Sequence, residues 1–261
     1  MTPRMLCPSE HVQDLKPTQI LCKYMPYSPG FRSLIELRCL YLSSLEFFKT
    51  KGDPLEGLTS FIEQDVTDNS EVQKWYETNK AHTFITCFVA GSAESEYMWN
   101  KYAGTLNGPG LMFKTTVGRL SDELRSPPCQ DRSPILSNEA SPCDGFTVGV
   151  VEYFNDSRMK LHEEMSQPIS NIRHVFRKRE DEFAKENEYR VMMKPGSTTS
   201  KSSQVEQLTY CFVEVDLPNL ISEIRLMPGA SQAFHDEIRT FLDNKGLAIT
   251  PLLRSDLDPT P

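Results

Sequence analysis

Short apolar runs separated by turn-forming or charged residues recur along the whole chain, and this pattern limits the fold more than any single motif. The clearest run, residues 81–89 (AHTFITCFV), is rich in the β-branched and aromatic side chains that favour strands. Similar runs predict further strands at residues 19–27, 39–43, 110–116, 146–154, 188–194, 210–217, 222–227 and 247–253. Apolar residues at helical spacing predict helices at residues 31–37, 95–103, 170–185 and 231–244.

The expected strands outnumber the helices and do not alternate strictly with them. This order favours an α+β fold with a mixed, mostly antiparallel sheet flanked by helices. Proline-rich, polar residues 121–145 predict a flexible insertion within a single domain that spans 19–253. Residues 1–18 are expected to form an N-terminal extension and residues 254–261 a disordered tail. The polar stretch 49–80 is expected to carry one or two surface helices.

Composition and charge exclude several classes of protein. Of the 261 residues, 38% are hydrophobic and 25% are charged, which is typical of a globular domain. The net charge of −8 disfavours broad binding to nucleic acid, because a phosphate backbone would repel it. The N-terminus lacks an apolar signal core and no run is long enough to span a bilayer, so we expect a cytoplasmic protein without membrane contact.

The seven cysteines are odd in number and no pair has CxxC spacing. Four of them lie in apolar, strand-like runs, which predicts reduced cysteines in the core: Cys22, Cys39, Cys87 and Cys211. The five histidines show no metal-binding spacing. The HExxH, Walker, GxSxG and GxGxxG motifs are also absent from the sequence, which argues against the common zinc protease, P-loop, hydrolase and dinucleotide-binding classes. We therefore expect no metal cofactor.

The most informative run is Glu186-x-Glu188-x-Arg190, where an expected helix passes into an expected strand. Alternate side chains of a strand share one face, so the two carboxylates and the guanidinium are expected to converge. Such a group can form a structural ion-pair network, bind a metal ion, or hold a nucleotide-like ligand through charge-assisted hydrogen bonds. The spacing alone leaves these alternatives open.

Three further features are candidates for a ligand site. Trp99 and Tyr102 lie three residues apart on an expected helix, where they form either a stacking platform or part of the core. Asp53, which precedes a proline in a polar segment, belongs either to a plain turn or to a ligand-binding loop. Lys23 interrupts the first apolar strand beside Tyr24 and must reach solvent or a carboxylate.

The order of these motifs resembles the uncharacterised bacterial family catalogued as domain of unknown function 2971. The motifs are CKY (22–24), GDPLEG (52–57), ITCFV (85–89), MWNKYAG (98–104) and the E-x-E-x-R run. The F-N-D-P turn of that family is Gly-Asp-Pro here, so its asparagine does not carry over. Because some members are associated with abortive infection, the resemblance implies a toxin-like effector in phage defence.

A weaker resemblance is to ADP-ribosyltransferase-like folds, because a basic residue, a hydroxyl pair and an E-x-E strand follow in that order. It implies an NAD-consuming enzyme, in which Glu188 is the catalytic carboxylate and Glu186 assists it. A carboxylate would stabilise the oxocarbenium-like centre that forms when the nicotinamide–ribose bond breaks. The residues expected to hold NAD are Lys23, Tyr24, Ser43, Asp53, Trp99, Tyr102 and Arg190.

Two other functions stay open. One is a metal-dependent nuclease or phosphoryl-transfer effector, in which Asp53, Glu186 and Glu188 would hold Mg²⁺; Lys178, Arg179 and Arg190 would then hold phosphate. The other is a non-catalytic, nucleotide-sensing binding module, in which the Glu/Arg run is a structural clamp. The partners expected are a small nucleotide ligand, a macromolecular acceptor and a regulatory protein.

Overall fold

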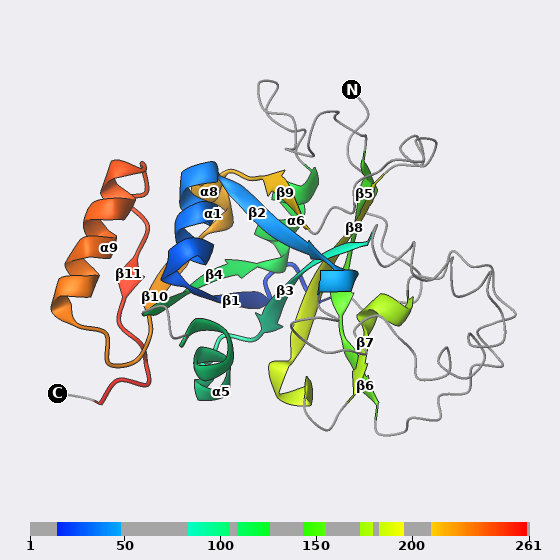
Figure 1. The fold of residues 1–261 in the computed structure, drawn as a ribbon, viewed down its shortest axis with the longest axis horizontal. Coiled ribbons are helices and arrows are strands. Elements are labelled where there is room, and N and C mark those ends of the chain that lie inside the picture. Colours follow the sequence, from blue (N-terminus) through cyan, green and yellow to red (C-terminus); the bar gives the residue numbers. More distant parts are fainter. Residues whose placement is uncertain are drawn as a thin grey trace, which may run out of the picture. The chain divides into compact units, whose positions relative to one another are not determined.

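The computed structural model describes residues 15–47, 83–104, 109–125, 143–154, 173–179, 183–195 and 210–259 (Figure 1). The chain divides into two compact units, each assembled from three stretches. Unit 1 comprises Met1–Asp14, Tyr41–Cys87 and Ser133–Phe212. Unit 2 comprises Leu15–Leu40, Phe88–Arg132 and Val213–Pro261. The sequence-based prediction of a single domain at residues 19–253 stays a prediction.

The predicted α+β class with a mixed, mostly antiparallel sheet is confirmed. Nine strands form one sheet, in which seven follow the order β11-β10-β4-β1-β3-β2-β9, while β8 pairs with both β3 and β5. Neighbouring strands run antiparallel in the β1–β3, β1–β4, β4–β10, β2–β3 and β5–β8 pairs. The β10–β11 pair is parallel, and β6 and β7 form a separate parallel pair. Within the described residues, no helix has the length and apolar character needed to cross a membrane.

Unit 2 contains most of the described helices. Its strands are β1 (Ile20–Pro26), β4 (Gly110–Thr116), β10 (Glu223–Leu226) and β11 (Leu252–Leu253). Its α-helices are α1 (Arg32–Leu37), α5 (Glu96–Met98), α6 (Val117–Arg125), α8 (Leu217–Leu220) and α9 (Gln232–Asn244). Two π-helical turns, η1 (Tyr27–Phe31) and η2 (Trp99–Ala103), precede α1 and follow α5. The strands β2 (Cys39–Ser44), β3 (Phe84–Ala90) and β9 (Tyr210–Glu214) each have residues in both units.

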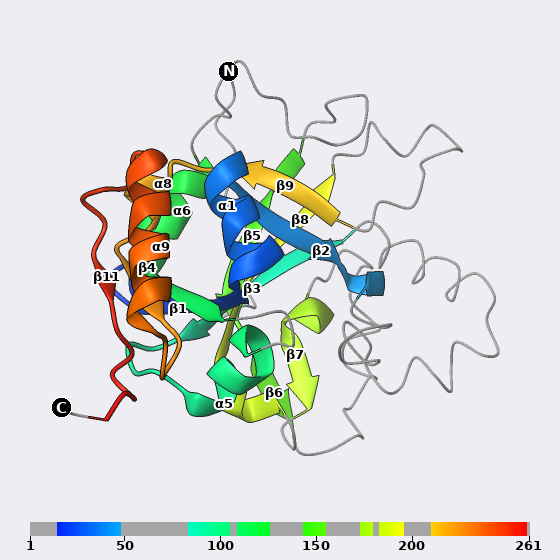
Figure 2. The same cartoon turned by 60° about the vertical axis from the view of Figure 1, so that its left-hand side comes forward.

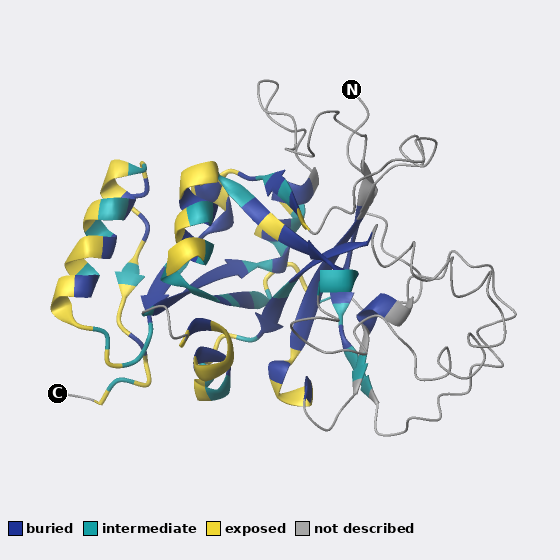
Figure 3. Ribbon diagram, viewed as in Figure 1, coloured by how far each residue is buried: buried dark blue, intermediate teal, exposed yellow. Residues whose placement is uncertain are grey.

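The helices of unit 2 pack on the apolar faces of its strands. In two views α1 and α9 lie beside each other, and Tyr27 at the start of η1 makes edge-on ring contacts with Phe234 and Phe241 of α9 (Figures 1 and 2). The helix α5 and the turn η2 instead cover the sheet face that carries Cys22 and Tyr24. Figure 3 shows the strands largely buried, whereas one side of α1 and of α9 is exposed.

Unit 1 is built around β8 (Glu188–Pro195), which pairs with β5 (Cys143–Val150). Shorter elements follow β5 along the chain: β6 (Glu152–Phe154), β7 (Arg177–Arg179) and the 3₁₀ turns η4 (Arg173–Phe176) and η5 (Ala184–Glu186). A small apolar cluster joins η4 and β8 to β3 and to the residue that follows β2: Leu45, Ile85, Val175, Phe176 and Met192.

Four sequence-based predictions of local structure are wrong. The strand predicted at residues 247–253 is confined to Leu252–Leu253. The segment predicted to be a helix at residues 170–185 contains, in its described residues, the 3₁₀ turns η4 and η5 and the short strand β7, which pairs with β6. The insertion predicted at 121–145 is too wide, since residues 121–125 end α6 and residues 143–145 begin β5. The tail predicted to be disordered from residue 254 is described as far as residue 259, and Ser255 is buried. The helices predicted within 49–80 lie outside the described residues.

Candidate functional site

Strand β8 brings Glu188 and Arg190 together, as the sequence predicts. The two side chains are separated by one residue and therefore project from the same face of the strand. The guanidinium of Arg190 turns back onto the carboxylate: Nε donates to Glu188 Oε1 at 2.6 Å and Nη2 donates to Oε2 at 3.1 Å. This two-point contact is the strongest geometry available to an arginine and a carboxylate.

Lys178 joins Glu186 to the same group. Glu186 lies not on the strand but in η5, and the left-handed residue Asn187 (φ 40°) separates it from β8. Lys178 comes from β7, and its Nζ lies 2.8 Å from Glu186 Oε2 and 2.8 Å from Glu188 Oε2. We call Lys178, Glu186, Glu188 and Arg190 the carboxylate cluster.

The carboxylate cluster is almost completely removed from solvent. The side chains of Glu186, Glu188 and Arg190 are 2%, 4% and 0% exposed. Burial raises the pKa of Glu188, but Arg190 and Lys178 outweigh it, so that its pKa lies far below the ordinary range. Glu188 is therefore ionised at neutral pH.

Backbone and neutral groups complete this buried network. Arg190 Nη1 donates to the carbonyl of Val175, and the amide of Glu188 donates to the hydroxyl of Tyr153 at 2.9 Å. The thiol of Cys87 also hydrogen-bonds to the Glu188 carboxylate. Each charged group of the cluster thus has partners within unit 1, which is the condition under which buried charges are tolerated.

The position of Lys178 is relevant to the hypothesis that Glu186 and Glu188 hold a metal ion. Its ammonium group lies between the two carboxylates, where a divalent cation bound by both would have to sit. In the part of the chain that the structure describes, no group of three or more His, Cys, Asp or Glu side chains is arranged to hold a metal ion. Asp53, the third ligand of that hypothesis, lies outside the described residues.

The other predicted site residues have separate surroundings. Ser43 is buried in β2, opposite Ile85 of β3. Lys23 belongs to unit 2, where its Nζ lies 5.0 Å from the centre of the Phe88 ring. The predictions therefore divide between the units: Ser43, Glu186, Glu188 and Arg190 lie in unit 1, and Lys23, Tyr24, Trp99 and Tyr102 lie in unit 2.

Of the predicted aromatic site residues in unit 2, Tyr24 and Trp99 belong to the core, whereas Tyr102 is exposed. Trp99 is 2% exposed and meets the Tyr24 ring edge-on, with ring centres 4.9 Å apart. The Tyr24 hydroxyl accepts from the amide of Ser95, and burial raises the pKa of Tyr24 to about 12. Tyr102 is 37% exposed. The expectation that Trp99 and Tyr102 share a helix face is wrong. In η2 the amide of Gly104 donates to the carbonyl of Trp99, five residues earlier. This turn is wider than that of an α-helix, so Tyr102 is rotated away from Trp99.

A second buried ion-pair network, in unit 2, was not predicted from the sequence. The Glu94 side chain is 1% exposed; it accepts from Trp99 Nε1 at 2.9 Å and pairs with Arg225 Nη1 at 2.7 Å. Arg225 also pairs with Glu223, which in turn lies 3.0 Å from Lys114 Nζ. Burial raises the pKa of Glu94, but its hydrogen bonds outweigh burial and lower the pKa. The spacing of Glu223-x-Arg225 on an expected strand, the same as in Glu188-x-Arg190, is the signal that could have revealed it.

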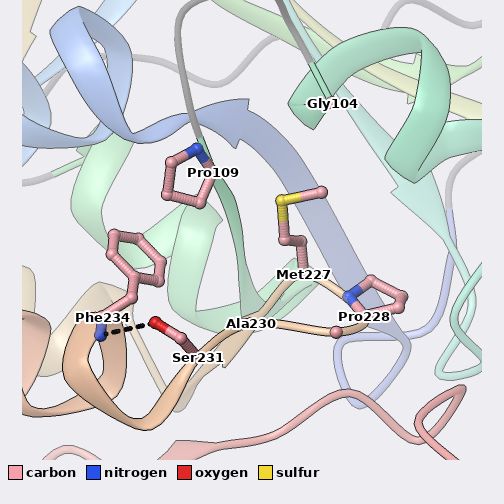
Figure 4. Close-up of a pocket in the computed structure, with 8 residues that line it drawn as sticks. Gly104, Pro109, Met227, Pro228, Ala230, Ser231 and Phe234 are labelled. Carbon is pink, nitrogen blue, oxygen red and sulfur yellow. Dashed lines mark hydrogen bonds between the residues drawn. The ribbon is translucent and has the colours of Figure 1, made fainter.

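A pocket of about 370 Å³ opens in unit 2 at the N-terminus of α9. Figure 4 shows Pro109, Met227 and Phe234 around the hollow, with Ser231 beside it. The full lining is Gly104, Pro109, Met227, Pro228, Gly229, Ala230, Ser231 and Phe234. None of these side chains is charged. The Ser231 hydroxyl caps α9 by accepting from the amide of Phe234 at 3.1 Å, and its own proton remains able to donate.

No protein-family model, no curated protein and no solved structure matches this chain. The resemblance to domain of unknown function 2971 and to ADP-ribosyltransferase-like folds therefore stays a prediction from the motifs.

Proposed function

We propose that this chain is a small-molecule binding module in which the carboxylate cluster is a structural clamp. The observation that carries the proposal is the state of Glu188. Both of its oxygens are held by buried cations, and its side chain is only 4% exposed. A carboxylate that stabilises a developing oxocarbenium ion must face the ribose of the substrate. In this conformation the guanidinium of Arg190 occupies that face instead.

The pocket of unit 2 supports the binding part of the proposal. Its volume falls in the range of small-molecule sites, and its walls are apolar. Phe234 offers a ring, and the Met227 thioether is a favourable neighbour for an aromatic ligand. One hydroxyl donor, Ser231, lies at the N-terminus of α9, where the helix dipole favours a polar or anionic group. The ligand class that fits is an uncharged aromatic ring with a polar or anionic substituent, as in a nucleotide.

The test is a calorimetric titration of the full chain with adenosine, AMP, nicotinamide and NAD, each in turn. We expect at least one of these ring compounds to bind, and Phe234→Ala to weaken that binding at least tenfold, roughly the loss expected when a buried ring contact is removed. The matched control is Phe241→Ala, which removes another ring of α9 that contacts Tyr27 but does not line the pocket. Equal loss in both variants, or no binding by the wild type, would overturn the proposal.

One observation favours the NAD-consuming enzyme as a second candidate. Glu188 and Arg190 converge in β8, as the motif of that candidate requires, and the Glu188 carboxylate carries the negative charge that would stabilise nicotinamide–ribose cleavage. Purified protein with NAD and cell lysate should then release nicotinamide, and Glu188→Gln should abolish the release while the fold persists. No release under conditions where a known transferase works would exclude this candidate. An effector role in phage defence, which the family resemblance implies, belongs to this second candidate.

A further inference from the structure

Residues 254–258, which we call the C-terminal strap, lie over the second ion-pair network of unit 2. The Ser255 hydroxyl donates to Glu94 Oε2, and the amide of Asp256 donates to Glu94 Oε1 at 2.8 Å. The Asp256 carboxylate pairs with Arg225. The Asp256 side chain is 66% exposed and Leu257 is 44% exposed, whereas Ser255 is buried. Polar contacts rather than apolar burial therefore hold the strap.

The surface beneath the strap is complete without it. Glu94 keeps its contacts with Trp99 and Arg225, and Arg225 keeps its contact with Glu223. The pair is thus charge-compensated by groups that belong to the sheet and to the segment around α5. Removal of the strap would leave no buried charge without a partner, so its loss should not unfold unit 2.

The strap also holds one wall of the pocket. Asp258 Oδ1 accepts from the amide of Gly229 at 2.6 Å, and Arg254 Nη1 donates to the carbonyl of Ala230 at 2.7 Å. Gly229 and Ala230 line the pocket. Two residues of the strap are therefore bonded to the backbone of the loop that shapes the ligand site.

We propose that the C-terminal strap is a displaceable lock on the pocket. Docked on Glu94 and Arg225, it fixes the loop 228–230; released, it lets this loop move and leaves the pocket without a fixed wall. The consequence for ligand binding rests on the proposed function, whereas the hold on the loop does not. Because ionic contacts carry the docking, high salt should promote release.

The experiment compares amide hydrogen exchange in the full chain with exchange in the combined variant Ser255→Ala, Asp256→Ala and Asp258→Ala. We expect amide exchange at residues 229–231 to accelerate about tenfold or more, as the loss of the hydrogen bond from Gly229 to a charged acceptor implies. Exchange in β1 and β4 should stay as in the wild type. About 1 M salt should shift the wild type toward the variant. The control is Asp243→Ala, which removes the exposed pair with Arg239 near the other end of α9.

Two outcomes would overturn the proposal. Unchanged amide exchange at residues 229–231 would show that the strap does not hold the loop. Accelerated exchange in β1 and β4 as well would show that the strap is an integral part of the fold rather than a displaceable lock.

A second measurement separates this inference from the proposed function. The fluorescent probe anilinonaphthalene sulfonate carries an apolar ring system and an anionic group, so it suits the pocket. We expect the triple variant to bind it several-fold more weakly than the wild type, because a loose wall is no longer preorganised. If the Phe234→Ala variant binds the probe as tightly as the wild type does, the pocket proposal fails. The exchange result still decides the role of the strap.

Discussion

Two strands carry a glutamate and an arginine separated by one residue, and in both the arginine turns back onto the glutamate. In β8 this gives the Glu188–Arg190 pair, and in β10 the Glu223–Arg225 pair. Charged groups from other segments join each pair, among them Lys178 in the first network and Glu94 in the second. The local pair follows from strand geometry. The third partner depends on tertiary packing, which is why it could not be read from the spacing.

The first prediction concerns the loss of the Glu188 charge. In Glu188→Gln, Lys178 keeps its contact with Glu186, whereas Arg190 loses its two-point pair with the Glu188 carboxylate. Breaking a buried ion pair in this way costs about 3–5 kcal/mol of unfolding free energy. The melting temperature should fall by roughly 10 °C. Urea unfolding and calorimetry measure both changes. The control, Glu36→Gln, removes the exposed pair with Arg32, whose side chains are 40% and 48% exposed, and should change the melting temperature little.

The same variant distinguishes a clamp from a catalytic group. A melting temperature equal to that of the wild type would mean that the carboxylate is dispensable for stability, as active-site groups often are. That result would contradict the structural role and revive the enzymatic proposal.

The second prediction concerns cysteine reactivity. Burial raises the pKa of the Cys22 thiol to about 12 and the side chain is 0% exposed, so little thiolate forms and reagents cannot reach it. Cys39 is partly exposed. Iodoacetamide at mildly alkaline pH should label Cys39 and spare Cys22, as peptide mass spectrometry of the native protein can show. Fast labelling of Cys22 in the folded chain would contradict this assignment.

Among the individual elements, apolar runs predicted the strands well and the helices less well. β1, β2, β3 and β4 all lie where their apolar residues predict them. The first turn of α6 was instead assigned to no element, and its second half to a flexible insertion. The helix predicted at residues 170–185 was wrong for another reason. Their apolar residues have helical spacing, but Arg177–Arg179 pairs with β6 and carries Lys178 to the carboxylate cluster. Tertiary pairing overrode the local period.

The third prediction tests the close approach of η2 to β4. A Cβ atom added to Gly110 would lie 2.4 Å from Ala103 Cβ and 2.5 Å from its carbonyl oxygen. Backbone cannot yield as a flexible side chain can, so Gly110→Ala should destabilise the protein by about 1–3 kcal/mol in urea unfolding. Gly30→Ala is the control, because its nearest neighbour would lie at 3.4 Å, an ordinary contact. Similar stability of both variants would contradict this packing.

At the scale of the whole chain, the class of fold was predictable and its assembly was not. Hydrophobic patterning established which segments are strands, and their order along the chain favoured an α+β sheet. Strand neighbours such as β4 and β10 are far apart in sequence, so local patterns carry no information on their pairing. The candidate site divides in the same way. The convergence of Glu188 and Arg190 was predicted, whereas the split of the other candidates between two units was not.

The last prediction is the acid dependence of stability, to which both buried networks contribute. The folded-state pKa values of Glu188 and Glu94 lie below the ordinary value of 4.5. A depressed carboxyl pKa stabilises the folded state fully above the unfolded-state value, and this stabilisation is lost as pH falls through the folded-state pKa. Glu123, whose pKa burial raises, acts in the opposite direction. Asp236 and Asp256, whose pKa values are lowered by hydrogen bonds, add to the effect of the two glutamates. Unfolding free energy measured from about pH 7 to about pH 3 should therefore hold steady and then fall below pH 4.5. The fall should be up to about 1.4 kcal/mol per pH unit for each carboxyl that takes up a proton on unfolding. Glu188→Gln should make this acid limb shallower, because one of the carboxyl groups with a lowered pKa no longer titrates. An acid limb of equal slope in the variant would mean that Glu188 is not held ionised by Arg190 and Lys178.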